Sequence, residues 1–304
     1  MVTVAGMVSV IITNYNYAQY VGQAVDSACS QSYKNIEILV VDDGSTDNSR
    51  EILQECARKD DRVRLFFQKN AGQAAATNKG IMEAEGEFIA FLDADDVWFT
   101  DKLERQIPLF ANKNVGVVYS SVKLIDMNGK EFGVRRTKKI EQGESFLHHI
   151  ILENFIPFTS SVVRRECFAL SGLLDSQYTV CTDYDLWLRL AKFYQFDCVQ
   201  DFLAGYRCRP DSLSGNPFQM ITVARQITDI FYIKNGKLFD PSFIKKERSD
   251  SYVNALYIFS RLNDRKNALS CLYKVIVTAP LSRKVIVSLL LVIKYFLLVP
   301  LRKK

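Results

Sequence analysis

The ten residues Glu87–Asp96, EFIAFLDADD, join an apolar run to a group of carboxylates. The run 88–92 has the length and composition of a strand that is buried on both faces of a parallel sheet. Three acidic residues follow it directly: Asp93, Asp95 and Asp96. Ligands of open α/β sheets bind at the carboxyl ends of the strands, so this stretch predicts both a type of sheet and the place of a site. The alternative is a plain polar loop in which Asp96 caps the next helix.

The spacing of the aspartates predicts a cation site. Asp93 and Asp95 form a D-x-D pair, and oxygen ligands of this kind suit Mg²⁺ or Mn²⁺. In a protein that binds a diphosphate, such a cation would neutralise the phosphates. We therefore expect a divalent cation at Asp95 and Asp93, and we interpret Asp96 as a cap or supporting group.

The first hundred residues alternate between strand-like and helical patterns. Strands are expected at 8–13, 36–41, 62–67 and 88–92, with helical segments between them. This alternation predicts an α/β fold with a doubly wound, mostly parallel sheet. The second strand runs into Asp42-Asp43-Gly44, so its acidic end should lie at the same edge as Asp93.

The rest of the chain shows a less regular pattern and then a helical region. Further strands are predicted at 115–125, 158–164, 196–199 and 202–206, and helices at 102–112, 142–154, 165–170 and from Thr182 onward. The last of these helices should bury Leu186, Leu190 and Phe193 on one face. No strand pattern returns after residue 215, which predicts two domains, 1–215 and 216–304, with the second wholly helical.

Composition excludes several classes of protein. With 304 residues, 48% hydrophobic and 24% charged, the chain is an ordinary globular protein. It carries 39 Lys or Arg and 34 Asp or Glu, but nine of the basic residues and none of the acidic ones follow Asp264. The part before Asp264 is therefore not basic enough to follow nucleic acid. Seven dispersed cysteines without a C-x-x-C pair, and no evident signal peptide, predict a reduced, cytoplasmic protein. The adjacent His148 and His149 cannot form a spaced zinc site.

The apolar segment 285–301 lies between basic residues. Seventeen residues is short for a membrane-spanning helix, and Lys294 near its centre would be costly there. We expect peripheral contact of 283–304 with an anionic membrane, which would place the protein at the inner face of the cell membrane. The alternative is a helical hairpin that packs on itself or in a homodimer.

The acidic and basic residues at predicted strand and helix ends suggest particular chemistry. Asp43 could accept hydrogen bonds from a base or ribose, and Asp183, at a helix start, could serve as a general base. Arg207 and Arg209 would face phosphate oxygens. Competing structural interpretations remain for other residues: Asp42 and Asp47 as turn and cap residues, Asp185 as the partner of Arg189 one helical turn on, and Trp187 as a core residue.

An ordered set of motifs resembles glycosyltransferase family 2. The motifs are VSVIITNYN at 8–16, VVDDGSTD at 40–47, N-x-G at 70–72 and 78–80, FLDADD at 91–96, TDYDLWLRL at 182–190 and YRCRPDSLS at 206–214. The resemblance covers about residues 8 to 214 in the family's order. It implies the GT-A fold and an inverting transfer of sugar from a nucleoside-diphosphate sugar, with a UDP-sugar as the expected donor and a glycan or lipid-linked hydroxyl as acceptor. The alternative is a nucleotide-sugar-binding protein without turnover.

The resemblance also implies roles for single residues. Thr13 and Tyr15 would line the nucleotide pocket, Asp43 would bind the base, and Asn78 would lie where the family closes over the nucleotide. Asp93 would lie near ribose and metal, Asp95 would coordinate the cation, and Asp183 would be the catalytic base. Two positions depart from the family pattern: Thr77 replaces a usual arginine, and Arg209 replaces the histidine of the Tyr-Arg-x-His loop.

Overall fold

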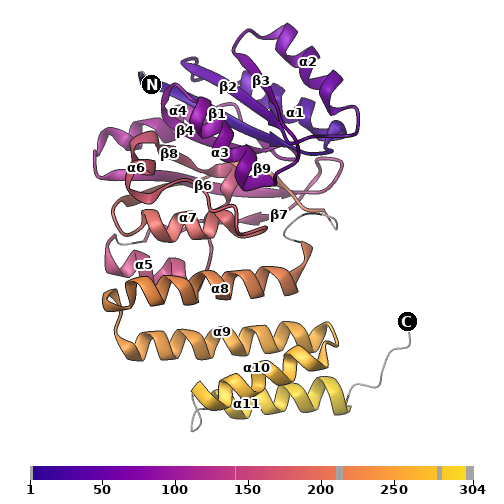
Figure 1. The fold of residues 1–304 in the computed structure, drawn as a ribbon, viewed down its shortest axis with the longest axis vertical. Helices are drawn as coiled ribbons and strands as arrows, with labels where there is room; N and C mark the ends of the chain where they lie inside the picture. Colours follow the sequence, from indigo (N-terminus) through magenta and orange to yellow (C-terminus); the bar gives the residue numbers. More distant parts are fainter. Residues whose placement is uncertain (1–2, 141, 210–211, 213–214, 279–282, 299–304) are drawn as a thin grey trace. The chain divides into compact units, whose positions relative to one another are not determined.

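The computed structural model of the chain describes residues 3–140, 142–209, 212, 215–278 and 283–298. It divides into two compact units, Met1–Gly215 and Asn216–Lys304, whose elements are labelled in Figure 1. Parts of the sequence motif 206–214 and of the tail 283–304 lie outside the described residues, namely 210–211, 213–214 and 299–304.

The first unit begins with four parallel strands in the order β3-β2-β1-β4. Their bounds are β1 (Val4–Asn14), β2 (Ile36–Asp42), β3 (Val63–Phe67) and β4 (Gly86–Asp93). The connecting helices are α1 (Ala18–Cys29), α2 (Ser49–Lys59) and α3 (Gln73–Glu83). The alternation predicted for the first hundred residues is thus confirmed.

The sheet continues beyond β4 with strands of mixed direction. The order is β4-β8-β6-β9-β5, with β7 beside β6; β8 is antiparallel to both of its neighbours, and β9 is parallel to β6. The strands are β5 (Val97–Trp98), β6 (Val115–Ile125), β7 (Glu131–Arg135), β8 (Val162–Arg164) and β9 (Gln195–Arg207). The helices are α4 (Lys102–Gln106), η1 (Ile107–Ala111), α5 (Glu144–Leu152), η2 (Phe158–Ser160), η3 (Arg165–Cys167), α6 (Phe168–Ser171) and α7 (Thr182–Leu190).

Three local predictions differ from the structure. Residues 158–160 form a 3-10 turn, because the Ser160 and Ser161 hydroxyls donate to the carbonyls three residues back, at 2.9 and 2.7 Å, and so compete with strand pairing. The two short strands expected at 196–206 are one strand, β9, which absorbs an irregular register against β6. Phe193 lies beyond the end of α7 and is half exposed, so it does not belong to the buried helix face.

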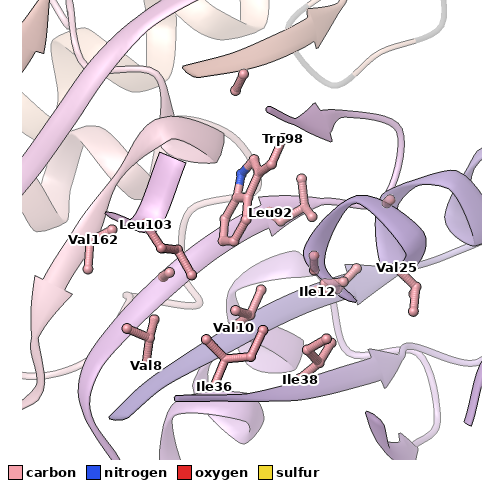
Figure 2. Packing of buried hydrophobic residues seen from close by; sticks show 14 of the residues in the cluster. Val8, Val10, Ile12, Val25, Ile36, Ile38, Leu92, Trp98, Leu103 and Val162 are labelled. Carbon is pink, nitrogen blue, oxygen red and sulfur yellow. The ribbon is translucent and has the colours of Figure 1, made fainter. Parts of the chain in front are cut away.

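The core lies between the sheet and the helices on one of its faces (Figure 2). Alternate residues of β1, Val8, Val10 and Ile12, point to this face, where they meet Ile36 and Ile38 of β2. Apolar side chains of α1, α2 and α4 cover them. Helix α3 packs against β1 and β2 through the residues of the other parity, including Ile11. Because both faces are covered, the strands are apolar on both sides, as their sequences indicate.

The second unit is helical throughout its described residues. It contains α8 (Pro217–Asn235), η5 (Gly236–Leu238), α9 (Pro241–Arg261), α10 (Arg265–Thr278), α11 (Arg283–Val292) and the π-helical η6 (Ile293–Leu298). Asn216 and Asp240 cap α8 and α9 through their side-chain oxygens. Helices α9, α10 and α11 contact one another around a small apolar core of Ala255, Leu256, Phe259, Ala268 and Cys271. Among the helices described, none has the length and apolar character needed to cross a membrane.

The contact between α3 and β1 requires a glycine at position 80. A Cβ atom built on Gly80 would lie 2.6 Å from Cγ2 of the buried Ile11. We predict that Gly80→Ala lowers the free energy of unfolding by about 1–3 kcal/mol, although alanine favours helices, because the close-packed sheet cannot yield. Urea unfolding would measure this loss. Gly236→Ala is the control, since nothing lies within 4 Å of its added Cβ; an equal loss in both variants would contradict the prediction.

Candidate active site

The register of the sheet brings three strand ends together. Thr13 of β1 pairs with Val41 of β2 and with Asp93 of β4, and Asn14 pairs with Asp42. Because these strands are parallel, their carboxyl ends share one edge. The expected proximity of the second and fourth acidic strand ends is therefore confirmed.

Hydrogen bonds hold the loops after β1 and β2 against each other. Asn14 Nδ2 donates to Asp42 Oδ2 at 2.7 Å and to Ser45 Oγ at 3.0 Å, and Asn16 Oδ1 accepts from the Thr46 amide at 2.7 Å. Asp42 also accepts from the Ser45 amide at 2.9 Å, as a turn residue does. Tyr15, in the middle of these loops, is 46% exposed, so its ring can receive a flat ligand.

Asp43 is buried and holds the loop between β3 and α3. Its carboxylate accepts hydrogen bonds from Gln68 Nε2 at 2.7 Å and from the amides of Ala71 and Gly72 at 2.9 and 2.8 Å. Asn78 has a similar function further along. Its amide group donates to the Leu174 carbonyl at 2.8 Å and accepts from the Leu174 amide at 2.9 Å. Both side chains thus fix loops at this edge; the nucleotide contacts expected of them stay predictions.

Asp93, Asp95 and Asp183 form the acidic centre of the site. Asp93 accepts from Gln73 Nε2 at 3.0 Å. Burial, followed by the charges of Asp95 and Asp183, raises the pKa of Asp93 to about 7. Asp183 lies at the start of α7, ninety residues after Asp93, and its charge is the third cause of this rise. Asp96 is buried beside this centre, where burial and then the charges of Asp95 and Asp93 raise its pKa, and it accepts from the Arg207 amide at 2.7 Å. Its interpretation as a supporting group is confirmed.

Arg207, the last residue of β9, and Arg209 contact Asp95 in different ways. Arg207 is almost fully buried, and its guanidinium donates to the Asp95 carbonyl at 2.6 Å, to the carbonyls of Asp126 and Met127, and to Gln23. Arg207 therefore joins the D-x-D loop to the β6–β7 turn and to α1. Arg209 instead reaches the carboxylate, with 3.3 Å between its Nε and Asp95 Oδ2.

Asp183 is oriented by a segment in which the sequence shows no motif. Asn154 Nδ2 donates to Asp183 Oδ2 at 3.0 Å, and the Asn154 carbonyl accepts from Arg135 of β7. Burial raises the pKa of Asp183, whereas the hydrogen bond from Asn154 and the charge of Arg135 oppose that rise. Cys181, just before α7, has a left-handed backbone with φ of 58°. Nothing in the spacing of residues along the chain predicts Asn154 or Gln73, because their importance comes from contacts formed only in the fold.

The neighbours of Asp183 on α7 are structural. Asp185 Oδ2 accepts from Arg189 Nη2 at 2.7 Å and from its Nε at 2.9 Å. Arg189 also donates to carbonyls of residues 171–173, which ties α7 to the end of α6. Trp187 is completely buried. The structural interpretations of Asp185 and Trp187 are both confirmed.

The acidic centre suits a divalent cation that is bound together with a diphosphate. Within the described residues, no group of three or more His, Cys, Asp or Glu side chains is arranged to hold a metal ion. Asp93 and Asp95 offer two carboxylates, and Mg²⁺ is usually bound by one or two carboxylates plus substrate phosphates. A cation bound at this place would favour the ionised form of Asp93, which burial and then the charges of Asp95 and Asp183 disfavour.

Removing the charge of Asp93 should stabilise the metal-free protein. The pKa of Asp93 is about 7 in the folded chain and 3.8 for an ordinary Asp. The folded protein therefore binds the proton of Asp93 more tightly than the unfolded chain does, which stabilises the fold at low pH. This stabilisation is lost as the pH rises through 7, because Asp93 then becomes charged in the folded protein. In EDTA at pH 8, we predict that Asp93→Asn gains about 1–3 kcal/mol of unfolding free energy, and that the gain shrinks at pH 5. Urea unfolding at both pH values tests this. Asp61→Asn, at an exposed position, should show no such pH-dependent gain.

Known proteins resemble the chain in sequence. The model of the family Glycosyl transferase family 2 matches residues 9–170. An uncharacterized glycosyltransferase of Nostoc sp. is 41% identical over 207 residues, which make up 66% of this chain and 64% of the relative. A Bacillus subtilis protein, whose name assigns it provisionally to teichuronic acid biosynthesis, is 31% identical over 75% of this chain and 91% of its own length. The chain thus spans less than two thirds of the Nostoc relative.

Solved structures share the fold. Staphylococcus aureus TarS 1–349 in complex with UDP-GlcNAc has a TM-score of 0.66 at 20% identity, covering 90% of this chain and 81% of that one. The mannosyltransferase PcManGT of Pyrobaculum calidifontis in complex with GDP-Man and Mn²⁺ has a TM-score of 0.63 at 16% identity, covering 95% and 81%. These likenesses show the GT-A fold. Together with the family match over more than half of its length, they establish that the chain belongs to glycosyltransferase family 2.

Proposed function

We propose that the chain is an inverting glycosyltransferase that moves a sugar from a nucleoside-diphosphate sugar to a hydroxyl acceptor in cell-surface polysaccharide synthesis. The observation that carries this proposal is the sheet register that brings the ends of β1, β2 and β4, with Asp42 and Asp93, to one edge. A UDP-sugar is the expected donor and a glycan or lipid-linked hydroxyl the expected acceptor. The TarS complex with UDP-GlcNAc and the teichuronic acid relative support this choice.

The donor would bind over the ends of β1, β2 and β4. Thr13 and the exposed ring of Tyr15 would line the base and ribose. Asp43 and Asn78 would shape this pocket through the loops that they hold, and Asp43 would also bind the base. Arg209 would contact the diphosphate, as expected of both arginines, whereas the guanidinium of Arg207 is bonded to protein groups and would instead fix the D-x-D loop.

Asp95 and Asp93 would hold the divalent cation, Mg²⁺ or Mn²⁺. When bound, the cation would neutralise the diphosphate and so favour its departure. The mannosyltransferase structure that contains Mn²⁺ supports this choice of cofactor.

Asp183 would act as the catalytic base. Its carboxylate takes the proton of the acceptor hydroxyl as the hydroxyl oxygen attacks the anomeric carbon. The new carbon–oxygen bond forms on the face opposite the breaking bond to the diphosphate, which inverts the configuration. Asn154 orients the carboxylate and, with Arg135, favours its ionised form against the effect of burial.

The amide variant of Asp183 separates an enzyme from a protein that only binds nucleotide sugars. We predict that Asp183→Asn lowers transfer at least about a thousandfold while nucleotide affinity changes less than about threefold, since the amide cannot accept the proton. Metal-dependent release of nucleoside diphosphate from a panel of nucleotide sugars, with an acceptor pool supplied, would measure transfer. Asp185→Asn on the same helix is the control and should retain transfer. Unchanged transfer by Asp183→Asn would refute the base assignment.

We further propose that the tail contacts an anionic membrane, which would place the protein at the inner face of the cell membrane. Helices α10 and α11 expose many apolar side chains: Leu269, Tyr273, Ile276, Val277, Ile286, Val287, Leu289 and Leu290. Exposed Arg265, Lys266, Lys274, Arg283 and Lys294 accompany them. An apolar surface with basic residues suits a lipid interface with anionic headgroups. The other occupant of this surface would be a second copy of the chain in a homodimer.

Vesicle binding distinguishes these occupants. We expect the full chain to float with phosphatidylglycerol-containing vesicles at low salt, and to bind less at high salt or with purely zwitterionic vesicles. Ile286→Glu should reduce binding at least about tenfold, because it places a charge on the apolar surface. Ile233→Glu, at an 81% exposed position on α8, is the control. A chain that stays in the soluble fraction with all vesicles, and sediments as a dimer, would overturn the membrane proposal.

A further inference from the structure

Arg209 lies against the carboxylate that is expected to bind the cation. Its Nε is 3.3 Å from Asp95 Oδ2, and the two side chains are only 5% and 13% exposed. An ion pair this well shielded from solvent is weakly screened. Asp95 therefore already has a positively charged neighbour that belongs to the protein.

Aromatic rings hold the Arg209 guanidinium in this position. Its central carbon lies 4.3 Å from the ring centre of Tyr17 and 5.3 Å from that of Tyr20. Both tyrosines come from the segment after β1, so Arg209 connects this segment with the D-x-D loop. Guanidinium groups stack well on aromatic faces, which keeps the charge near Asp95.

Arg207 cannot take over this function, although it is only two residues away. Its guanidinium donates to the carbonyls of Asp95 and Asp126 and to Gln23, so it is committed to fixing the loop. Arg207 thus fixes the backbone of the D-x-D loop, whereas Arg209 compensates the negative charge of the Asp95 carboxylate.

We propose that Arg209 is a built-in counter-ion that keeps divalent cations from binding firmly to Asp95 until a nucleoside diphosphate is present. In the free protein, a cation at Asp95 has to compete with the guanidinium. A bound diphosphate supplies oxygen ligands for the cation and also negative charge for Arg209, so both positive groups can then be accommodated. The cation would consequently enter together with the nucleotide. The inference rests on the proposed function and adds the order of binding.

Binding of Mn²⁺ alone tests this inference without any sugar transfer. We would titrate the full, metal-free chain with Mn²⁺ and measure the free ion by electron paramagnetic resonance. Arg209→Gln should bind Mn²⁺ at least about tenfold more tightly than the wild type, because the competing charge is removed. Arg209→Lys, which keeps the charge, should stay within about threefold of the wild type. Arg105→Gln is the matched control, since it removes the same charge from an exposed pair with Asp101 and Asp201.

The results decide the proposal in either direction. Equal Mn²⁺ affinity of Arg209→Gln and the wild type would overturn it. An increase in Mn²⁺ affinity in Arg209→Lys as large as that in Arg209→Gln would also overturn it, because loss of packing and not loss of charge would then explain the effect. Arg209→Met, also neutral, replaces Arg209→Gln if a thermal melt shows that the latter is unfolded. Repeating the titration with UDP or GDP tests the donor separately. If neither nucleotide tightens Mn²⁺ binding to the wild type, the order of binding and the choice of UDP or GDP as donor nucleotide both fail, whereas the nucleotide-free comparison still decides whether Arg209 competes with the cation.

Discussion

Mutual repulsion of carboxylates is the constraint on which this site depends. Asp93, Asp95 and Asp183 lie close enough for their charges to raise the pKa of Asp93, and burial adds to that cost. An isolated loop and helix end would move apart under this repulsion. The surrounding sheet prevents this, because β1 lies between β2 and β4 in a parallel arrangement whose two faces are both packed. The packed core thus provides the stability that keeps the three carboxylates close together despite their repulsion.

Most contacts around this acidic centre join a side chain to the backbone of a neighbouring loop. Arg207 and Asp96 join the D-x-D loop to the end of β9, through the Asp95 carbonyl and the Arg207 amide. Asp43 fixes the loop before α3, and Asn78, on α3, fixes the segment around Leu174 that precedes α7. Such side chains act on backbone groups, and they leave few functional atoms to the ligand. Rigid support of this kind is what places a few reactive groups within the narrow distances that catalysis requires.

Much of the first unit follows from local sequence. Strands β1, β2 and β4 are recognisable as mainly apolar, buried runs that end at polar residues, and the helices after them have one apolar face. Two of the wrong predictions have different physical causes. At 158–160 the serine hydroxyls bond to nearby carbonyls and close a turn. At 196–206, pairing with the long strand β6 keeps a single strand, β9, continuous where the sequence pattern predicts two short strands.

The sequence by itself determined the family motifs, the acidic strand ends and the helical character of the second unit, since these depend on residue type and spacing along the chain. Only the tertiary structure decided which polar groups from distant parts of the chain contact one another. In the fold, Asp43 and Asn78 bond to loops, and Arg207 donates to the Asp95 carbonyl. Arg209 pairs with the Asp95 carboxylate, and Asn154 donates to Asp183. The physical reason is that a hydrogen bond or ion pair is set by distances of about 3 Å between segments far apart in the chain, and residue spacing does not encode those distances.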